Sequence, residues 1–198
     1  MTTPVTAALV KELRDRTGAG MSDCKKALEA TAGDLDKAAE KLRMDGAAKA
    51  DKKAGRTAAE GVIALAAGSD AVALVEINSE TDFVAKGEDF RRLAHDLALH
   101  IAAASPRWVS AEDVPPEVLE QERELYRRQA EQEGRPPAVI DRIVENKVAR
   151  FYEEHCLLEQ PFVRDPAVRV KELIAQTAAK VQEHIAVRRF SRFSIREA

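Results

Sequence analysis

Residues 62–77 read VIALAAGSDAVALVEI and decide the fold class of this chain. The apolar runs 62–66 and 71–77 have strand-like composition, and residues 68–70 between them have the composition of a turn. This pattern predicts a β-hairpin. Patterns typical of helices lie on both sides of it, so we expect an α+β protein in which a small antiparallel sheet packs with helices.

The chain after the hairpin predicts a turn and then a long helix. Residues 79–86 read SETDFVAK and lead directly out of the second strand. Apolar residues then repeat at helical spacing from Phe90 to Ile101, and Ser105-Pro106 ends the pattern. We expect one face of this helix to cover the sheet.

The C-terminal half predicts a helical hairpin, a further helix and a closing strand. Two amphipathic patterns separated by Gly134 predict antiparallel helices over about residues 115–156. A last helix is expected from about Pro166 to Gln182. The strand-like run 185–195 is expected to complete the sheet.

The N-terminal residues 1–45 predict three short helices. Ser22 is the expected N-cap of the second helix, Gly33 ends it, and Asp34 is expected to cap the third. Three helices in so short a segment resemble the ubiquitin-associated module. We therefore expect a ubiquitin-associated-like domain with a compact, alanine-packed core.

The remaining segments complete the expected domain organisation. Residues 46–58 are small and charged, with an excess of basic side chains, and predict a partly helical basic linker. Residues 59–198 would then form the α+β core that contains the helical hairpin. The closing strand carries a row of arginines that would either protect a sheet edge or contact a partner: Arg188, Arg189, Arg192 and Arg196.

Charge and composition argue against several classes of protein. Of the 198 residues 33% are charged, but the formal net charge is -3, so the chain lacks the basicity that drives non-specific nucleic-acid binding. No apolar run approaches the roughly 18 residues that span a bilayer. Cys24 and Cys156 have neither metal-binding nor redox spacing. We expect a soluble cytoplasmic protein with reduced thiols, no membrane contact and no direct nucleic-acid binding.

The sequence carries no recognisable catalytic, metal or nucleotide site. It lacks a P-loop, and Gly18-Ala19-Gly20 lacks the third glycine of a dinucleotide site. His95 and His100 lie five residues apart, not the four that align two imidazoles on a helix, so solvated or capping histidines are expected. We expect no enzyme activity and no cofactor, and a protein or small-ligand partner is favoured.

Two motifs give the chain a family resemblance. Residues 79–86, SETDFVAK, and residues 17–28, TGAGMSDCKKAL, together resemble the signature pair of the bacterial elongation factor Ts family. Arg188-Arg189-Phe190 extends the resemblance over nearly the whole chain. Members of this family exchange guanine nucleotide on the GTPase elongation factor Tu, so the resemblance implies that partner and a role in translation elongation.

The resemblance also implies which residues of the first motif act. The turn would enter the GTPase, with Phe83 as an aromatic anchor and Asp82 rearranging the contacts around the bound magnesium ion. GDP would then leave faster, and incoming GTP would displace the factor. The implied contact residues of this turn are Thr81, Asp82, Phe83, Val84 and Ala85.

A second contact would come from the N-terminal module. Its glycines allow a close backbone approach, and a methionine adapts to a groove on a partner. The implied contact residues are Leu13, Gly18, Gly20, Met21 and Lys25.

Each motif also has a structural explanation that the sequence leaves open. Thr81 can cap a helix, Asp82 can complement its dipole, and Phe83 can pack inward. The glycines near the N-terminus can simply form a turn in a three-helix core. A binding adaptor without exchange activity is therefore the main alternative, and an RNA-binding translation accessory is a weaker one because the net charge is negative.

The length of the chain implies a short form of the family. Longer members carry two similar halves in their core, whereas this chain has room for one. Such a form is expected to pair as a homodimer through its core, which an isologous two-fold interface would satisfy. Ser191 stands in the closing strand where a cysteine would have suggested a crosslink.

Overall fold

The computed structural model describes residues 4–53 and 55–195, and these contain both helices and strands, as the α+β prediction requires. They form two compact units. The first contains the residues up to 63 together with 76–94 and 172–186, and the second contains 64–75, 95–171 and the residues from 187 onward. Arg196 of the predicted arginine row lies outside the described residues.

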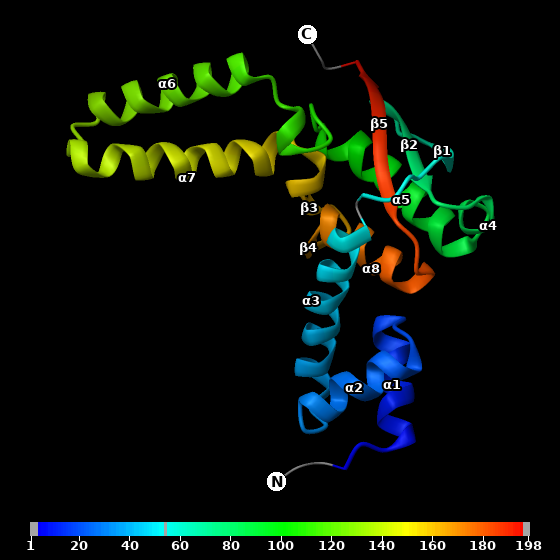
Figure 1. Cartoon of the computed structure of the whole chain (residues 1–198). Coiled ribbons are helices and arrows are strands. Elements are labelled where there is room, and N and C mark those ends of the chain that lie inside the picture. Colours follow the sequence, from blue (N-terminus) through cyan, green and yellow to red (C-terminus); the bar gives the residue numbers. More distant parts are fainter. Residues whose placement is uncertain (1–3, 54, 196–198) are drawn as a thin grey trace. The chain divides into compact units, whose positions relative to one another are not determined.

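Three helices open the first unit: α1 (Ala7–Thr17), α2 (Met21–Ala30) and α3 (Leu35–Lys53) (Figure 1). Gly18 ends α1 with a φ of 68°, which a residue without a side chain adopts at little cost. Asp34 caps α3 as predicted, because its carboxylate accepts hydrogen bonds from two backbone amides of the next turn at 3.1 and 3.0 Å. Ser22 is not the N-cap of α2. The extended backbone of Gly20 occupies that position, so Ser22 already lies inside the helix.

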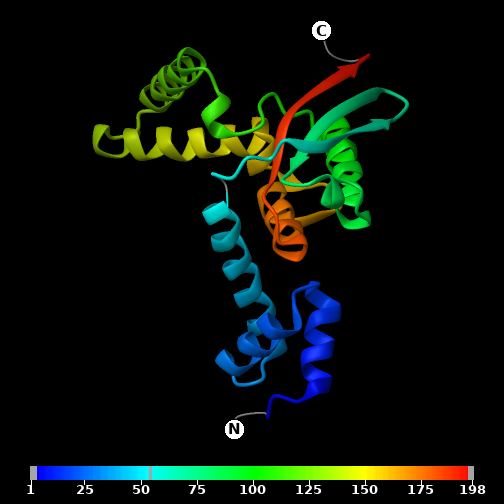
Figure 2. The same cartoon turned by 45° about the vertical axis from the view of Figure 1, so that its right-hand side comes forward.

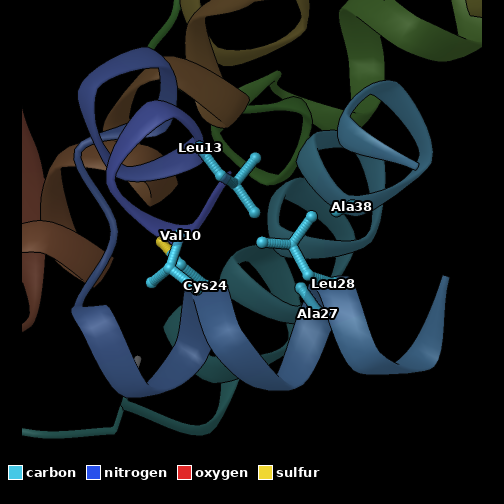
Figure 3. Close-up of a cluster of buried hydrophobic side chains, with 6 residues drawn as sticks. All are labelled: Val10, Leu13, Cys24, Ala27, Leu28 and Ala38. Atoms are coloured by element: carbon cyan, nitrogen blue, oxygen red, sulfur yellow. The ribbon is translucent and has the colours of Figure 1, made fainter. Parts of the chain in front are cut away.

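These three helices enclose a small apolar core. Figure 3 shows side chains from all three helices gathered between the ribbons. The cluster consists of Val10, Leu13, Cys24, Ala27, Leu28 and Ala38. Its two alanines let the helices approach closely, as expected for a core this small.

The helix α3 is longer than the sequence predicted. It runs for 19 residues to Lys53, so residues 46–53 of the predicted linker are helical. The segment is rich in alanine and lysine and contains no proline. The helix therefore continues on intrinsic propensity after its apolar face has ended.

The predicted hairpin is confirmed. The strands β1 (Glu60–Ala67), β2 (Ala71–Ser79) and β5 (Ile185–Ser194) form one sheet in the order β1-β2-β5 (Figure 2). The amide of Gly68 donates to the carbonyl of Ala71 at 2.8 Å and closes the turn. The amide of Ile195 donates to the carbonyl of Asp70 at 3.1 Å, which places the end of β5 beside the start of β2. The closing strand thus completes an antiparallel sheet.

Two helices follow β2: the short α4 (Asp82–Ala85) and the long α5 (Glu88–Ala104). The predicted end of α5 at Ser105-Pro106 is confirmed. Within the second unit, the Nε atom of Arg192 on β5 donates to the carbonyl of Ala102 at 3.1 Å. The C-terminal part of α5 therefore lies against β5, where the sequence placed it.

The helical hairpin is also confirmed, as α6 (Pro116–Gln132) and α7 (Pro137–His155), which pack against each other (Figure 1). A short 3₁₀ turn, η1 (Ala111–Asp113), precedes it. Each helix has a proline in its first turn, where the missing amide costs nothing. The buried side chains between the two helices are Ala130, Ile140, Val144 and Val148.

The last helix, α8 (Val170–Val181), starts later than the sequence predicted. The expected start near Pro166 is wrong, because β4 (Asp165–Arg169) occupies that segment and pairs antiparallel with β3 (Pro161–Phe162). Proline is tolerated in such a two-stranded ribbon because it need not donate a ladder hydrogen bond.

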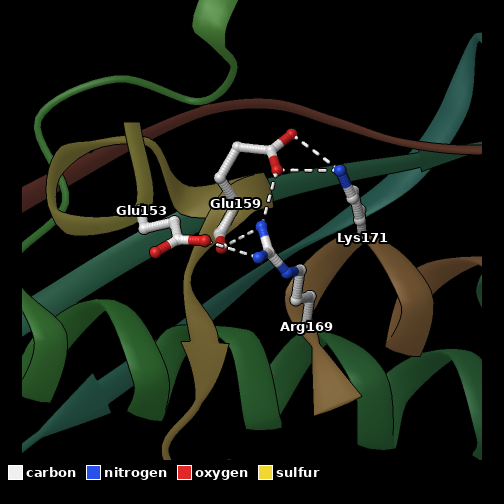
Figure 4. Close-up of polar contacts among 4 residues, drawn as sticks. All are labelled: Glu153, Glu159, Arg169 and Lys171. Atoms are coloured by element: carbon white, nitrogen blue, oxygen red, sulfur yellow. Dashed lines mark hydrogen bonds and ion pairs between the residues drawn. The ribbon is translucent and has the colours of Figure 1, made fainter. Parts of the chain in front are cut away.

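Ion pairs tie this ribbon to the chain that precedes it. The guanidinium of Arg169 contacts the carboxylates of both Glu153 and Glu159, and the Nζ atom of Lys171 lies 2.7 Å from Glu159 (Figure 4). A two-stranded ribbon is marginal on its own. The two terminal nitrogens of Arg169 contact different carboxylates, and these charged contacts add to the ribbon's own two-stranded pairing.

One histidine prediction is wrong. His95 is exposed, as expected of a solvated histidine, but His100 is completely buried. The apolar face of α5 extends through His100, whose Nε2 atom lies 2.9 Å from the Oε1 atom of Gln160. Gln160 follows a second 3₁₀ turn, η2 (Leu157–Glu159). A long-range hydrogen bond, which spacing along the helix cannot reveal, makes this burial possible.

Candidate functional site

Residues 79–86 run from the last residue of β2 through a tight turn and the short helix α4, and together they form the site turn. Thr81 is the N-cap of α4, and its Oγ1 atom accepts a hydrogen bond from the amide of Val84 at 3.4 Å. Ser79, buried at the end of β2, donates its hydroxyl to the carbonyl of Thr81 at 3.0 Å. These two bonds from short side chains restrain the backbone on both sides of Thr81.

The turn exposes Phe83 and buries the two residues that follow it. Phe83 is 84% exposed, the highest fraction among the large apolar side chains that the structure describes, whereas Val84 and Ala85 are 8% and 4% exposed. The interpretation in which Phe83 packs inward is therefore wrong. The buried side chains of Val84 and Ala85 anchor the turn, and the ring of Phe83 is exposed to solvent.

Asp82 lies beside this ring as an accessible carboxylate. Its Oδ2 atom is 2.6 Å from the Nζ atom of Lys86, one helical turn later, and both side chains are exposed. The hydrogen bond from Lys86 lowers the pKa of Asp82, and the same bond raises the pKa of Lys86. Asp82 is thus ionised at neutral pH. Its exposed ion pair can be exchanged for contacts with a partner at small cost.

Two carboxylates link this turn to the residues between α8 and β5. The Oε2 and Oε1 atoms of Glu183 accept hydrogen bonds from the amide and the hydroxyl of Thr81 at 3.0 and 2.6 Å. Glu80 accepts a hydrogen bond from the amide of His184 at 2.7 Å. Sequence reasoning missed Glu183, which lies 102 residues from Thr81. The sequence predicted only that the closing strand completes the sheet, and the structure shows that it lies next to β2.

The second motif forms the loop between α1 and α2. Met21 is 48% exposed, and Lys25 is also exposed. A Cβ atom added to Gly20 would meet no atom within 4 Å, so the backbone is open to solvent there. Leu13, in contrast, is fully buried in the three-helix core. Leu13 therefore does not lie on the accessible face of the loop, whereas Met21 and Lys25 do.

Metal sites and membrane-spanning helices were two further possibilities for the described part of the chain. Within residues 4–53 and 55–195, no three His, Cys, Asp or Glu side chains are grouped as metal ligands. None of the helices in those ranges has the length and apolar character needed to cross a membrane.

Comparisons with known proteins identify the family. A family model described as Elongation factor TS matches residues 91–197, which is more than half of the chain. Elongation factor Ts of Carboxydothermus hydrogenoformans is 52% identical over 195 residues, which cover 98% of this chain and 90% of the relative. The proteins of that name from Coprothermobacter proteolyticus and Thermosipho melanesiensis are 52% and 51% identical over 98% of this chain and cover 99% and 100% of their own lengths. This chain therefore belongs to the elongation factor Ts family.

Proposed function

We propose that this protein is a guanine-nucleotide exchange factor for elongation factor Tu and acts in the cytoplasm during translation elongation. Family membership supplies the partner, and the exposure of Phe83 carries the proposal. An aromatic ring that is 84% exposed at the end of a capped turn has the properties of an interface anchor.

The turn would act by entering the nucleotide domain of elongation factor Tu. Phe83 would be buried between helices of the GTPase, and burial of one such side chain contributes about 1.5–3 kcal/mol. Asp82, ionised and paired only with an exposed lysine, would rearrange contacts around the magnesium ion. Magnesium requires near-ideal octahedral geometry and binds through few protein oxygens and the phosphates, so a small displacement weakens both metal and GDP.

The thermodynamics of exchange require negative coupling between the factor and the nucleotide. If the factor weakens the binding of GDP to the GTPase, linkage requires that the nucleotide weakens the binding of the factor by the same amount. Incoming GTP then displaces the factor. A 10³-fold mutual weakening corresponds to about 4 kcal/mol. One buried aromatic side chain and its surroundings can supply that difference. No covalent step is needed, so the protein would not be an enzyme.

The three N-terminal helices would provide a second contact as a ubiquitin-associated-like domain. Met21 and Lys25 would meet the partner, and Gly20 would allow a close approach of the loop. Gly18, which lies next to the side chain of Lys180, would shape the loop through its positive φ. The open space around Gly20 and the exposure of Met21 support this role. Leu13 would act from within the core by fixing the loop.

A second copy of this chain is the proposed partner of the outer sheet face. The bond between Gly68 and Ala71 places Leu65 opposite Leu74. The bond between Ile195 and Asp70 places Phe193 of β5, and Ile195 directly after that strand, on the same face as Leu74. The exposed apolar side chains of this face are Leu65 (55%), Leu74 (40%), Phe193 (68%) and Ile195 (80%). An isologous dimer would bury this apolar surface.

Release of a fluorescent GDP analogue from purified elongation factor Tu tests the exchange function. The wild-type protein should accelerate release strongly, and Phe83→Ala and Asp82→Ala should each reduce the acceleration. Val163→Ala, which removes another exposed apolar side chain, is the matched control. A folded wild-type protein that does not accelerate release would exclude the exchange function and favour the adaptor alternative.

Sedimentation equilibrium tests the dimer. The wild type should sediment as a dimer, and Leu74→Glu together with Phe193→Glu should produce a folded monomer, because each protomer would then bring two charges into the interface. A monomeric wild type at micromolar concentration would refute the dimer and would leave the exchange proposal to its own assay.

A further inference from the structure

The turn between α8 and β5 makes specific contacts with the site turn inside the first unit. Glu183 receives two hydrogen bonds from Thr81, one from its backbone amide at 3.0 Å and one from its hydroxyl at 2.6 Å. The same hydroxyl accepts from the amide of Val84 at 3.4 Å. A chain of hydrogen bonds therefore runs from the Glu183 carboxylate through Thr81 into the first turn of α4. Phe83 is the residue just before Val84.

The site turn in return supplies a carboxylate to the turn between α8 and β5. Glu80 accepts from the amide of His184 at 2.7 Å, and the guanidinium of Arg56 lies 3.4 Å from Glu80. The Nδ1 atom of His184 lies 3.0 Å from the carbonyl of Arg56. Each turn thus supplies a carboxylate to a backbone amide of the other, which fixes their relative orientation more tightly than one bond could.

The backbone before Glu183 is held in an uncommon conformation. Gln182 has a φ of 63°, in the left-handed region that residues other than glycine rarely adopt. Such a conformation costs free energy and persists where surrounding contacts determine it. Here it reverses the chain after α8 and presents the carboxylate of Glu183 to Thr81.

We propose that Glu183 is a positioning residue for Phe83, acting through Thr81. This inference rests on the proposed exchange function. The buried side chains of Val84 and Ala85 fix α4 to the core, whereas no described contact restrains the ring of Phe83. The direction of the ring therefore depends on the backbone of the turn. The carboxylate of Glu183 fixes that backbone before the partner is met, so that no binding energy is used to order it.

The effect belongs to the exchange step more than to association. Most of an interface forms whether or not one ring is aligned, so the concentration for half-maximal effect should change little. Displacement of the nucleotide requires the ring of Phe83 in one orientation. The maximal rate of GDP release should therefore fall when Glu183 is replaced. Such a split between maximal rate and half-saturation distinguishes positioning from general loss of binding.

Three variants test the proposal in the GDP-release assay with saturating factor. Glu183→Ala should lower the maximal acceleration about tenfold, and Glu183→Gln about threefold, because an amide oxygen can still accept one of the two hydrogen bonds. Asp89→Asn is the matched control. It removes the carboxylate that pairs with Lys180 of α8 at 2.6 Å without touching Thr81, and should retain the wild-type maximum.

Hydrogen exchange supplies a readout that does not depend on elongation factor Tu. The amides of Thr81 and Val84 should exchange about tenfold faster in Glu183→Ala, while those of α5 and β2 keep their wild-type protection. Thr81→Val removes the hydroxyl bond to Glu183 and the cap on the Val84 amide, but the amide of residue 81 can still donate to Glu183. The loss of maximal rate caused by Glu183→Ala should therefore be smaller in the Thr81→Val background than in the wild type.

The outcomes separate the two proposals. A wild-type protein without exchange activity refutes the proposed function, and hydrogen exchange still decides whether Glu183 orders the turn. An active wild type with an unchanged maximum in Glu183→Ala overturns the positioning role. An equal loss in Asp89→Asn, or a general loss of protection in Glu183→Ala, overturns it in favour of a purely structural role.

Discussion

The Nε2 atom of His100 lies 2.9 Å from the Oε1 atom of Gln160, and both side chains are buried in the second unit. The amide of Val163 donates to the Nδ1 atom of the same imidazole at 3.2 Å. Nε2 must therefore carry the proton, and the ring is neutral. Gln160 in turn donates to the carbonyl of Glu154 at 2.8 Å, so the amide and the imidazole satisfy each other inside the fold.

This arrangement predicts that the protein loses stability in mild acid. Burial lowers the pKa of His100, although the hydrogen bond with Gln160 acts in the opposite direction. The unfolded chain takes up a proton below about pH 6.5, while the folded protein resists it. Above that pH, His100 should therefore contribute no pH dependence to the free energy of unfolding. Below it, the free energy should fall by up to about 1.4 kcal/mol per pH unit until the folded pKa is reached.

Urea unfolding between pH 7.5 and 5 measures this slope, with His100→Gln as the comparison. The variant cannot titrate at this position and should have a flatter profile, whatever its absolute stability. The ion pair between Asp96, one helical turn before His100, and Arg164 is partly exposed and is present in both proteins. Equal slopes in the two proteins would show that His100 takes up its proton in the folded state.

The sequence predicted those features that depend on local patterns. Thr81 before an acidic residue predicted the N-cap of α4, and Asp34 predicted the cap of α3; both bonds are present. The glycine-containing turn at 68–70 between two apolar runs predicted the hairpin. In each case the deciding interaction joins residues only a few positions apart, so the pattern contains it.

Features that depend on distant partners could not be predicted in the same way. His100 resembles any histidine on a helix until Gln160, 60 residues later, makes its burial possible. Glu183 has no local signature, since its role arises from the register of β5 against β2. The strand β4 displaced the predicted start of α8 because its pairing with β3 outweighs the local helical pattern. Local patterns left open whether Phe83 packs inward. Its exposure, which the family resemblance implied, follows from the burial of Val84 and Ala85.

The N-terminal helices should unfold when their core is opened. Leu28 is fully buried in a cluster of six side chains, and Leu28→Ala should cost about 2–5 kcal/mol. A core of this size has little stability to lose. The amides of α1 and α2 should therefore lose their protection from hydrogen exchange, while those of α6 and α7 keep it. Hydrogen exchange by mass spectrometry measures this. Met44→Ala, which truncates a side chain that is 65% exposed, should leave the protection of α1 and α2 unchanged.

Both cysteines should be unreactive in the native protein. Cys24 and Cys156 are completely buried, and burial raises the pKa of both thiols, that of Cys156 to about 11. The thiolate is the reactive form, so an aromatic disulfide reagent at pH 8 should label neither residue within minutes. In denaturant the same reagent should label both. Rapid labelling of Cys24 alone in native buffer would instead reveal local opening of the three-helix core.

Gly61 should tolerate no side chain, although it lies in a strand where alanine is common. A Cβ atom at this position would lie 2.2 Å from the carbonyl oxygen of Ile77 on the neighbouring strand. Since the obstacle is backbone, no rotamer change relieves it, and β1 would have to move away from β2. Gly61→Ala should therefore lower the free energy of unfolding by about 2–4 kcal/mol.

Gly68 is the control for this substitution, because it belongs to the same hairpin. A Cβ atom at Gly68 would lie 3.6 Å from the carbonyl oxygen of Ala71, an ordinary contact. Gly68→Ala should change the free energy of unfolding by less than about 1 kcal/mol, and the reduced freedom of the unfolded chain offsets part of any loss. Chemical denaturation of the two variants distinguishes a clash at one site from a general intolerance of the hairpin. Similar losses in both would mean that the close approach of β1 to Ile77 is not what requires glycine at position 61.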